Sequence, residues 1–451
     1  MRDLFFVGFL AVFVLLGLRR PYLWVLGYVY VDIVSPQRLS YYLLNAVPIS
    51  LIFFLLALGG WALRDEHDGL RLSGRQALML MLLGWCGYTT LTADFPTEAL
   101  EKWSWVWKAL TFALFLPVTL RTRLRIEALL LFMVLSAASI IIVGGVKTLA
   151  SGGGYGMLNL MVDNNAGLYE GSIISTVAVA IIPLILVLAR FGTIFPRDAR
   201  VTLFAAALIF ACLLIPIGTQ ARTGLICIGL LAVLHLRDSR HRLLWMGGMA
   251  AAVAVAVPLL PASYTERMNT IQGYQADQSA STRLAVWRWT WDYVQDHPGG
   301  GGFNAYLQNR LTVRLKGTAE GDEVAHEKSR AYHSAYFEML GEQGFFGFGL
   351  WLALQLAGLA QMELLRRRFL RSAAPDEAWI APLAGALQQG HLIYLVGAGF
   401  VAIAFQPFVF MLIAAEIGLS QWARRTRPAG TARGFAAAPP VAPWIRPPRS
   451  T

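Results

Sequence analysis

Apolar blocks of roughly 15 to 22 residues recur along the whole chain, and they restrict the possible folds more than any other feature. Crossing the hydrocarbon core of a bilayer takes about 20 apolar residues, and backbone polar groups cannot stay unpaired in lipid. The composition agrees, because 56% of the residues are hydrophobic and 14% are charged, with a mean hydropathy of +0.54. The sequence therefore predicts an all-α polytopic membrane protein.

We predict 12 or 13 transmembrane helices, eleven from the long apolar blocks and one or two from shorter blocks near the N-terminus. The predicted spans lie near residues 43–63, 77–92, 103–120, 126–146, 173–189, 201–217, 223–236, 243–260, 343–362, 379–400 and 406–422. Two shorter blocks, 4–18 and 22–34, precede them. Asp32 interrupts the second of these, so it stays open whether both cross the membrane.

The connections between the predicted spans alternate in charge. Every second one is basic, namely those at residues 64–75, 121–125, 190–200, 237–242, 366–371 and 424–425. Basic connections stay on the cytoplasmic side of the inner membrane, so the long polar segment 261–342 is predicted to face the periplasm. The net charge of +11 therefore reflects membrane topology and predicts no nucleic-acid partner.

We predict one transmembrane domain, residues 1–422, which contains a helical periplasmic insertion at residues 261–342. A helix is expected from Arg283 to Val294, where apolar side chains have helical spacing, followed by a glycine-rich breaker at residues 297–302 and a charged stretch to Arg330. The tail, residues 423–451, is rich in Pro, Gly and Ala and is predicted to be disordered in the cytoplasm.

Several polar residues are placed where they could perform chemistry. Arg222 lies between two spans in the sequence GTQARTG, and a charge at the membrane boundary suggests function, although lipid head groups could also hold it. Arg283 and Arg288 alternate with tryptophans, including Trp287, which suits a ligand with phosphates and sugar rings. A helix anchored by tryptophans at the membrane interface explains the same pattern equally well.

His333 begins the segment HSAYFEML that enters the next span, and an imidazole placed there can serve as a general base near neutral pH. A structural histidine is the commoner alternative. Asn164, in a polar turn before a span, either starts a helix or lines the site. The spacing of His297, His326 and His333 matches no common metal motif, so we expect neither a metal nor a cofactor.

Together these motifs resemble the bacterial O-antigen ligase family over nearly the whole chain. The similar features are the arginine–glycine turn at Arg222, the R-x-x-x-W element of Arg283 and Trp287, the glycine run before Phe303, and His333 followed by the Leu340-Gly341-Glu342 segment. The opening Met-Arg-Asp-Leu and the Asp163-Asn-Asn look closest to the exosortase-associated O-glycosylation ligase subgroup. The Gln220-Ala221 pair departs from the Ser-Arg common in the family.

The resemblance implies an inverting, metal-independent glycosyltransferase of the inner membrane with a periplasmic active site. The donor would be a glycan on undecaprenyl diphosphate, and the acceptor a hydroxyl of lipid A-core. His333 would be the base, and Arg222, Arg288 and Arg283 would bind the diphosphate. Further expected substrate contacts are Trp287, Tyr332, Tyr336, Asn164 and Arg330.

Three other functions stay open at this point. An O-antigen polymerase or a protein O-oligosaccharyltransferase would use the same donor with a different acceptor, and no residue here distinguishes them. A glycolipid transporter would predict ionisable residues near mid-membrane and inverted repeats. Asp32, His391 and Glu416 are the main ionisable candidates, and no repeat is visible.

Overall fold

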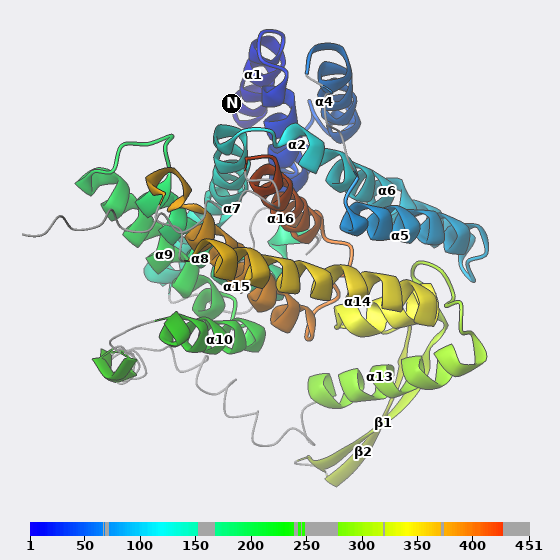
Figure 1. Ribbon diagram of the computed structural model, residues 1–451. Coiled ribbons are helices and arrows are strands. Elements are labelled where there is room, and N and C mark those ends of the chain that lie inside the picture. Colours follow the sequence, from blue (N-terminus) through cyan, green and yellow to red (C-terminus); the bar gives the residue numbers. More distant parts are fainter. Residues whose placement is uncertain are drawn as a thin grey trace, which may run out of the picture.

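The protein is described by a computed structural model for residues 1–65, 67, 72–151, 167–238, 242–244, 246–248, 278–318, 321–370 and 374–426. Most of the predicted span 243–260, the tail beyond residue 426 and Asn164 lie outside these residues. The described part is almost entirely helical (Figure 1).

The first half of the chain is a series of helices. They are α1 (Arg2–Gly17), α2 (Tyr22–Val34), α3 (Pro36–Leu39), α4 (Ile49–Arg64), α5 (Gly74–Leu91), α6 (Pro96–Thr119), α7 (Arg123–Ser151), η1 (Gly167–Tyr169), α8 (Gly171–Phe191) and α9 (Ala199–Gly218). The second half contains α10 (Arg222–Asp238), α13 (Gln278–Asp296), η3 (Ala305–Gln308), β1 (Arg310–Thr318), β2 (Gly321–Lys328), α14 (Ala335–Phe369), η4 (Pro375–Glu377), α15 (Ile380–Ala398) and α16 (Pro407–Thr426).

The predicted fold class is confirmed. Four of the described helices, α7, α8, α9 and α14, are long and apolar enough to cross a membrane, and α2 and α4 are shorter apolar helices. Their exposed surface is rich in large apolar side chains, as lipid contact requires. The total of 12 or 13 spans stays a prediction.

The helices pack into one bundle around a continuous apolar core. Its centre is the contact of α8 with α15, where glycines let the two backbones approach closely. A Cβ atom on Gly390 would come within 2.6 Å of the Ala180 carbonyl oxygen, and one on Gly397 within 2.3 Å of Thr176. Around this pair lie α14, α9 and α10, and α7 connects them to α2 and α4.

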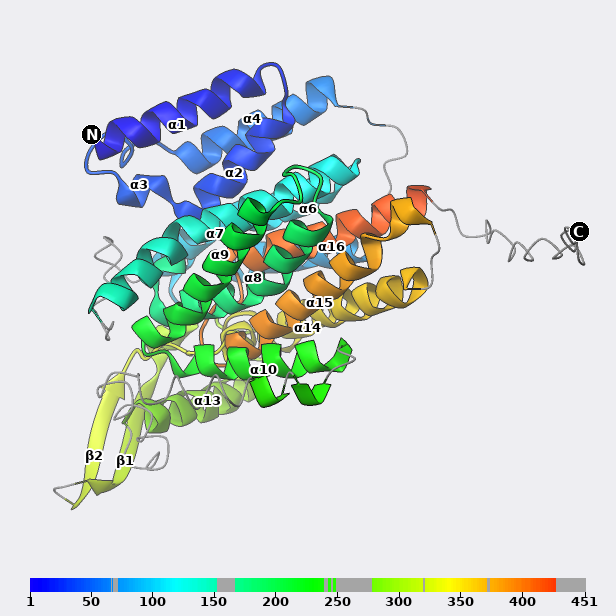
Figure 2. The ribbon, with the colours of Figure 1, turned by 90° about the vertical axis from the view of Figure 1, so that its left-hand side faces the viewer.

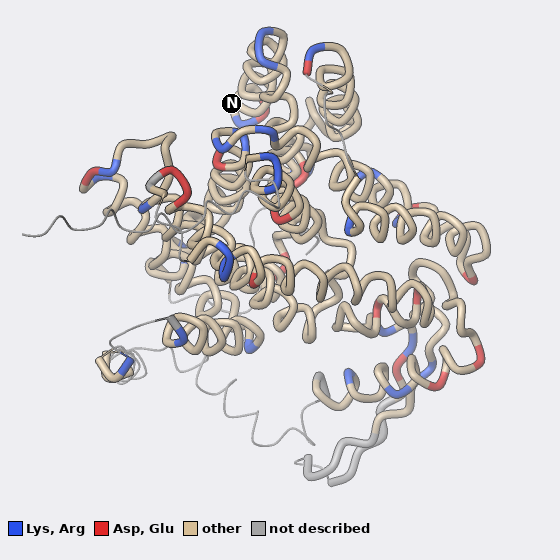
Figure 3. Tube along the Cα trace, in the orientation of Figure 1, with Lys and Arg blue, Asp and Glu red and all other residues tan. Residues whose placement is uncertain are grey.

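Four of the six basic connections, at residues 64–75, 121–125, 190–200 and 424–425, meet at one end of the bundle. Arg125 pairs with Asp65 at 2.6 Å, Arg123 donates to the Phe191 carbonyl at 2.6 Å, and Arg425 donates to the Leu120 carbonyl at 3.1 Å. Figure 3 shows long stretches of the helices without charged residues. The turns before α8 and α10 and the start of α14 lie at the opposite end.

The polar insertion differs in part from the prediction. Its helix is present as α13, but the charged stretch after the glycine run folds into an antiparallel hairpin, β1–β2, that extends beyond the helices (Figure 2). Leu311 and Val313 of β1 pack with Val286 of α13 and with Tyr332 in a small second core. The described part of the insertion is therefore a helix packed on a hairpin rather than wholly helical.

Candidate active site at the junction of α13 and α14

His333 lies in the short connection between β2 and α14, with Ser334 as the residue that caps the helix. Its backbone has a φ of 49°, the left-handed region that histidine adopts more readily than most residues. The backbone on its N-terminal side is fixed, because the Trp287 Nε1 donates to the Tyr332 carbonyl oxygen at 2.8 Å. The side chain of His333 is exposed, so a substrate in solution or at a lipid surface can reach it.

Two arginines that the sequence singled out act on this imidazole through their positive charges. The pKa of His333 is lowered from 6.5, first by partial desolvation of the ring and then by the positive charges of Arg283 and Arg330. Protonation would place a third positive charge beside these two. The neutral imidazole, which can accept a proton, is thus the favoured form near neutral pH.

Helix α13 holds Arg283 in this position. The Trp287 ring, one turn after Arg283, stacks on Phe337 of α14 with the centroids 5.1 Å apart and the planes 5° from parallel. Residues four apart share a helix face, so Arg283 lies on the side of α13 that meets α14. Arg288 is on an exposed face and is not among the groups that lower the pKa of His333.

The other predicted contacts near His333 are already engaged with protein. Tyr332 is 1% exposed and packs on Gly341, where a Cβ atom would come within 2.5 Å of its hydroxyl. Tyr336 donates to the Leu395 carbonyl at 3.1 Å and meets Trp351 edge-on. Arg330 pairs with Glu327 at 2.8 Å. Whether these residues also contact substrate stays a prediction.

Arg222 is the first residue of α10, directly after a tight turn in which Gln220 has a φ of 52°. The turn is fixed by a hydrogen bond between the Ser175 and Thr219 hydroxyls, which lie 2.8 Å apart. Gly224 also packs closely there, because a Cβ atom added to it would come within 2.6 Å of Pro216. A Cβ atom on Gly224 would also come within 3.1 Å of Ser175, and the next residue, Thr176, lies against Gly397 at the C-terminal end of α15, where the Leu395 carbonyl accepts a hydrogen bond from the Tyr336 hydroxyl. Arg222 therefore lies at the same end of the bundle as His333, and both ribbon views place α10 and α13 along one side (Figures 1 and 2).

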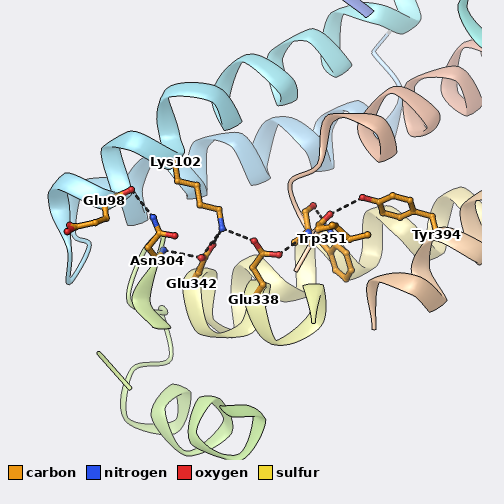
Figure 4. A network of polar contacts seen from close by, with 9 residues as sticks. Glu98, Lys102, Asn304, Glu338, Glu342, Trp351 and Tyr394 are labelled. Carbon is orange, nitrogen blue, oxygen red and sulfur yellow. Dashed lines mark hydrogen bonds and ion pairs between the residues drawn. The ribbon is translucent and has the colours of Figure 1, made fainter. Parts of the chain in front are cut away.

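A buried charged cluster beside this junction was missed by the sequence analysis. The Lys102 Nζ of α6 lies 2.7 Å from the Glu338 Oε1 and 2.8 Å from the Glu342 Oε2, both on α14 (Figure 4). The second Glu338 oxygen accepts the Ala404 N–H at 2.9 Å, and Glu342 accepts the Asn304 N–H at 3.0 Å. We call Lys102, Glu338 and Glu342 the Lys102 clamp.

The glycine run before Phe303 docks next to this clamp. The N–H groups of Gly301 and Gly302 donate to the carbonyls of Gly341 and Glu342 at 3.0 Å each, and Phe345 donates to the Pro298 carbonyl at 3.0 Å. Side chains are excluded on both sides, because a Cβ atom on Gly300 would come within 2.5 Å of the Gly344 nitrogen. The glycine-rich breaker predicted at residues 297–302 is thus a segment whose backbone packs directly on the backbone of α14. We call this contact the seam.

No three His, Cys, Asp or Glu side chains within the described ranges are arranged to hold a metal ion. The charged groups at the junction are arginines, one lysine and paired carboxylates.

Comparison with known families gives two matches along the chain. Residues 205–352 match a family described as O-antigen ligase, and residues 1–193 match a family of unknown function. The first match ends just after α8 and the second begins inside α9, although the two helices pack on each other within one core. No curated protein matches the chain.

The O-antigen ligase match contains Arg222, α13 with Arg283, and His333. The exosortase-associated subgroup is not confirmed and stays a prediction. The match to the O-antigen ligase family thus covers residues 205–352 of the 451-residue chain, and it supports the resemblance seen in the sequence.

Proposed function

We propose that this protein transfers a glycan from undecaprenyl diphosphate to a hydroxyl of lipid A-core, with inversion and without a metal, at the periplasmic face of the inner membrane. The observation that carries the proposal is the exposed imidazole of His333 at the junction next to the membrane helices, where partial desolvation and the charges of Arg283 and Arg330 lower its pKa. The family match supports a glycosyltransferase of this kind.

The proposed step needs two things that this junction offers. The acceptor hydroxyl is a poor nucleophile, so His333 takes its proton as the oxygen attacks the anomeric carbon. The bond from that carbon to the diphosphate oxygen breaks, and the electron pair leaves with the diphosphate. Guanidinium groups stabilise this negative charge, and we assign that role to Arg283 and Arg222, with Arg288 as a further donor contact.

The acceptor is tested with the purified protein in lipid nanodiscs. The donor is an undecaprenyl-diphosphate-linked glycan, and lipid A-core, a second lipid-linked glycan or a Ser/Thr-containing protein is offered in turn. We expect product on lipid A-core. Product on protein alone would support an O-oligosaccharyltransferase, and product on the lipid-linked glycan alone a polymerase. Glycolipid translocation that survives the loss of His333 would support a transporter.

The same assay tests the role of metal. We expect an unchanged rate in excess EDTA, because arginines rather than a divalent ion neutralise the leaving group in this mechanism. A rate that EDTA removes and that added magnesium or manganese restores would contradict the arginine mechanism.

We expect kcat/KM to fall at low pH as His333 becomes protonated, and we call this fall the acid limb. Because the pKa of His333 is lowered, the acid limb should lie below the ordinary imidazole value of 6.5. Arg330→Gln removes one of the two charges that disfavour the imidazolium. The pKa of His333 should then rise, and the limb should move to higher pH.

The matched control for this variant is Arg310→Gln. Arg310 is an exposed arginine of β1 whose Nη1 donates to the Asn309 carbonyl at 2.9 Å, and it is not among the charges that lower the pKa of His333. Its acid limb is expected to stay in place. An equal shift for both variants would mean that the overall charge, rather than Arg330, sets the limb.

A further inference from the structure

The start of α14 is a separate helical piece. Its helical geometry is broken at Gly344, which has a φ of 65° and a ψ of −170°. Residues 335–343 therefore do not take their direction from the membrane-crossing part of α14 that follows. Other contacts must set the direction of this piece, and His333 lies only two residues before it.

The Lys102 clamp supplies the charged part of those contacts. Lys102 is the one residue of the clamp that reaches both carboxylates, and its side chain is 12% exposed, against 7% for Glu338 and 1% for Glu342. The two glutamates lie four residues apart, so a single ammonium group fixes both the rotation and the height of one helix face. Through their remaining bonds, they join that face to Asn304 and Ala404.

We propose that Lys102, Glu338 and Glu342 are positioning residues that hold the short helix 335–343 so that His333 lies beside Arg283. The inference rests on the proposed function, because it assigns the clamp to the catalytic imidazole. The clamp does not contact substrate in this account. It acts on the reaction only through the place of His333.

Stability alone is a weak reason for such a clamp. Removing charges from water is costly, and apolar residues of similar size often stabilise a fold as well as a buried ion pair does. The ion pairs restrict the helix 335–343 to one orientation, because each carboxylate oxygen must meet a particular donor. Misplacing a catalytic group by about 1 Å can lower a rate by about 10²-fold.

The test is Lys102→Met, measured for rate and for the pH dependence of kcat/KM in the nanodisc assay. We expect a fall in kcat of about 10²-fold. The acid limb should rise toward the ordinary imidazole value, because His333 moves away from the charges that lower its pKa. Since Lys102→Met leaves two buried carboxylates facing each other, the variant Lys102→Met/Glu338→Gln/Glu342→Gln removes that repulsion and should show the same two changes.

The matched control breaks an equally buried ion pair that does not involve the helix 335–343. Arg75 of α5 lies 2.6 Å from Glu416 of α16, with side chains 6% and 0% exposed. Arg75→Met is expected to lower the thermal stability without moving the acid limb. A general loss of packing would affect both variants alike.

A double mutant shows whether Lys102 acts through His333. In a His333→Ala background, Lys102→Met should cause no further loss of the residual rate, because the group that it positions is absent. An equal loss in both backgrounds, or a wild-type rate and acid limb in Lys102→Met, would overturn the inference. Full activity of His333→Ala would instead overturn the proposed function.

Discussion

The His333→Ala protein is expected to lose glycan transfer by about 10²–10⁴-fold, the usual contribution of a positioned general base. The acceptor hydroxyl would keep its proton as it attacks the anomeric carbon. Purified variant and wild-type protein are compared in the nanodisc assay with saturating donor and lipid A-core.

The fold is expected to survive this change, because the imidazole is exposed and not part of the apolar core. Alanine is less suited than histidine to the φ of 49° at this position, so His333→Asn is the matched variant, since asparagine tolerates left-handed backbone. Both proteins should melt near the wild-type temperature and be equally inactive. A His333→Asn protein with wild-type turnover would remove histidine from the mechanism.

Arg283→Gln is expected to lower kcat by about 10²–10³-fold, the typical cost of losing one group that stabilises a developing negative charge. It should also move the acid limb of kcat/KM to higher pH, because Arg283 contributes to the lowered pKa of His333. The two effects have one cause, the loss of the guanidinium beside the imidazole.

Two further variants of α13 sharpen this result. Arg283→Lys keeps the charge but not the fork of donors, so we expect a low acid limb with a rate that is only partly restored. Arg288 lies on the exposed face of α13, so Arg288→Gln should leave the acid limb of kcat/KM in place. If Arg283→Gln changed neither the rate nor the limb, Arg283 would have no role in the reaction.

The membrane helices could be predicted closely because each rests on an uninterrupted local signal. The spans predicted at 173–189 and 201–217 appear as α8 (Gly171–Phe191) and α9 (Ala199–Gly218). Helix α6 begins at Pro96, seven residues before its predicted span, because Glu98, Glu101 and Lys102 carry charge on a helix that continues past the apolar block. Hydropathy detects the part of a helix that lies in lipid and not its polar extension.

The hairpin was missed although its signal is present in the sequence. Leu311, Val313 and Leu315 alternate with polar residues, a period of two that is typical of a strand. The high charge of this stretch hid the alternation.

The sequence singled out His333 and Arg283, whose roles stay predictions, but it did not reveal the contacts that position them. Lys102 is 236 residues from Glu338, and such a pairing leaves no local pattern. The close approach of Gly300 and Gly344 also leaves no local pattern, because each glycine alone predicts only an interruption of helix. Contacts between distant segments depend on the three-dimensional packing, which short motifs do not encode.

The break in α14 has a consequence for how the chain assembles. At the bend, the Phe345 N–H donates to the Pro298 carbonyl, and the carbonyls of Gly341 and Glu342 accept from glycine N–H groups. The backbone groups at the bend are therefore all hydrogen-bonded only when the glycine run is in place. Until then, α14 has no partner that stabilises its left-handed residue. The bend in α14 and the glycine run before Phe303 are therefore expected to reach their native shapes together.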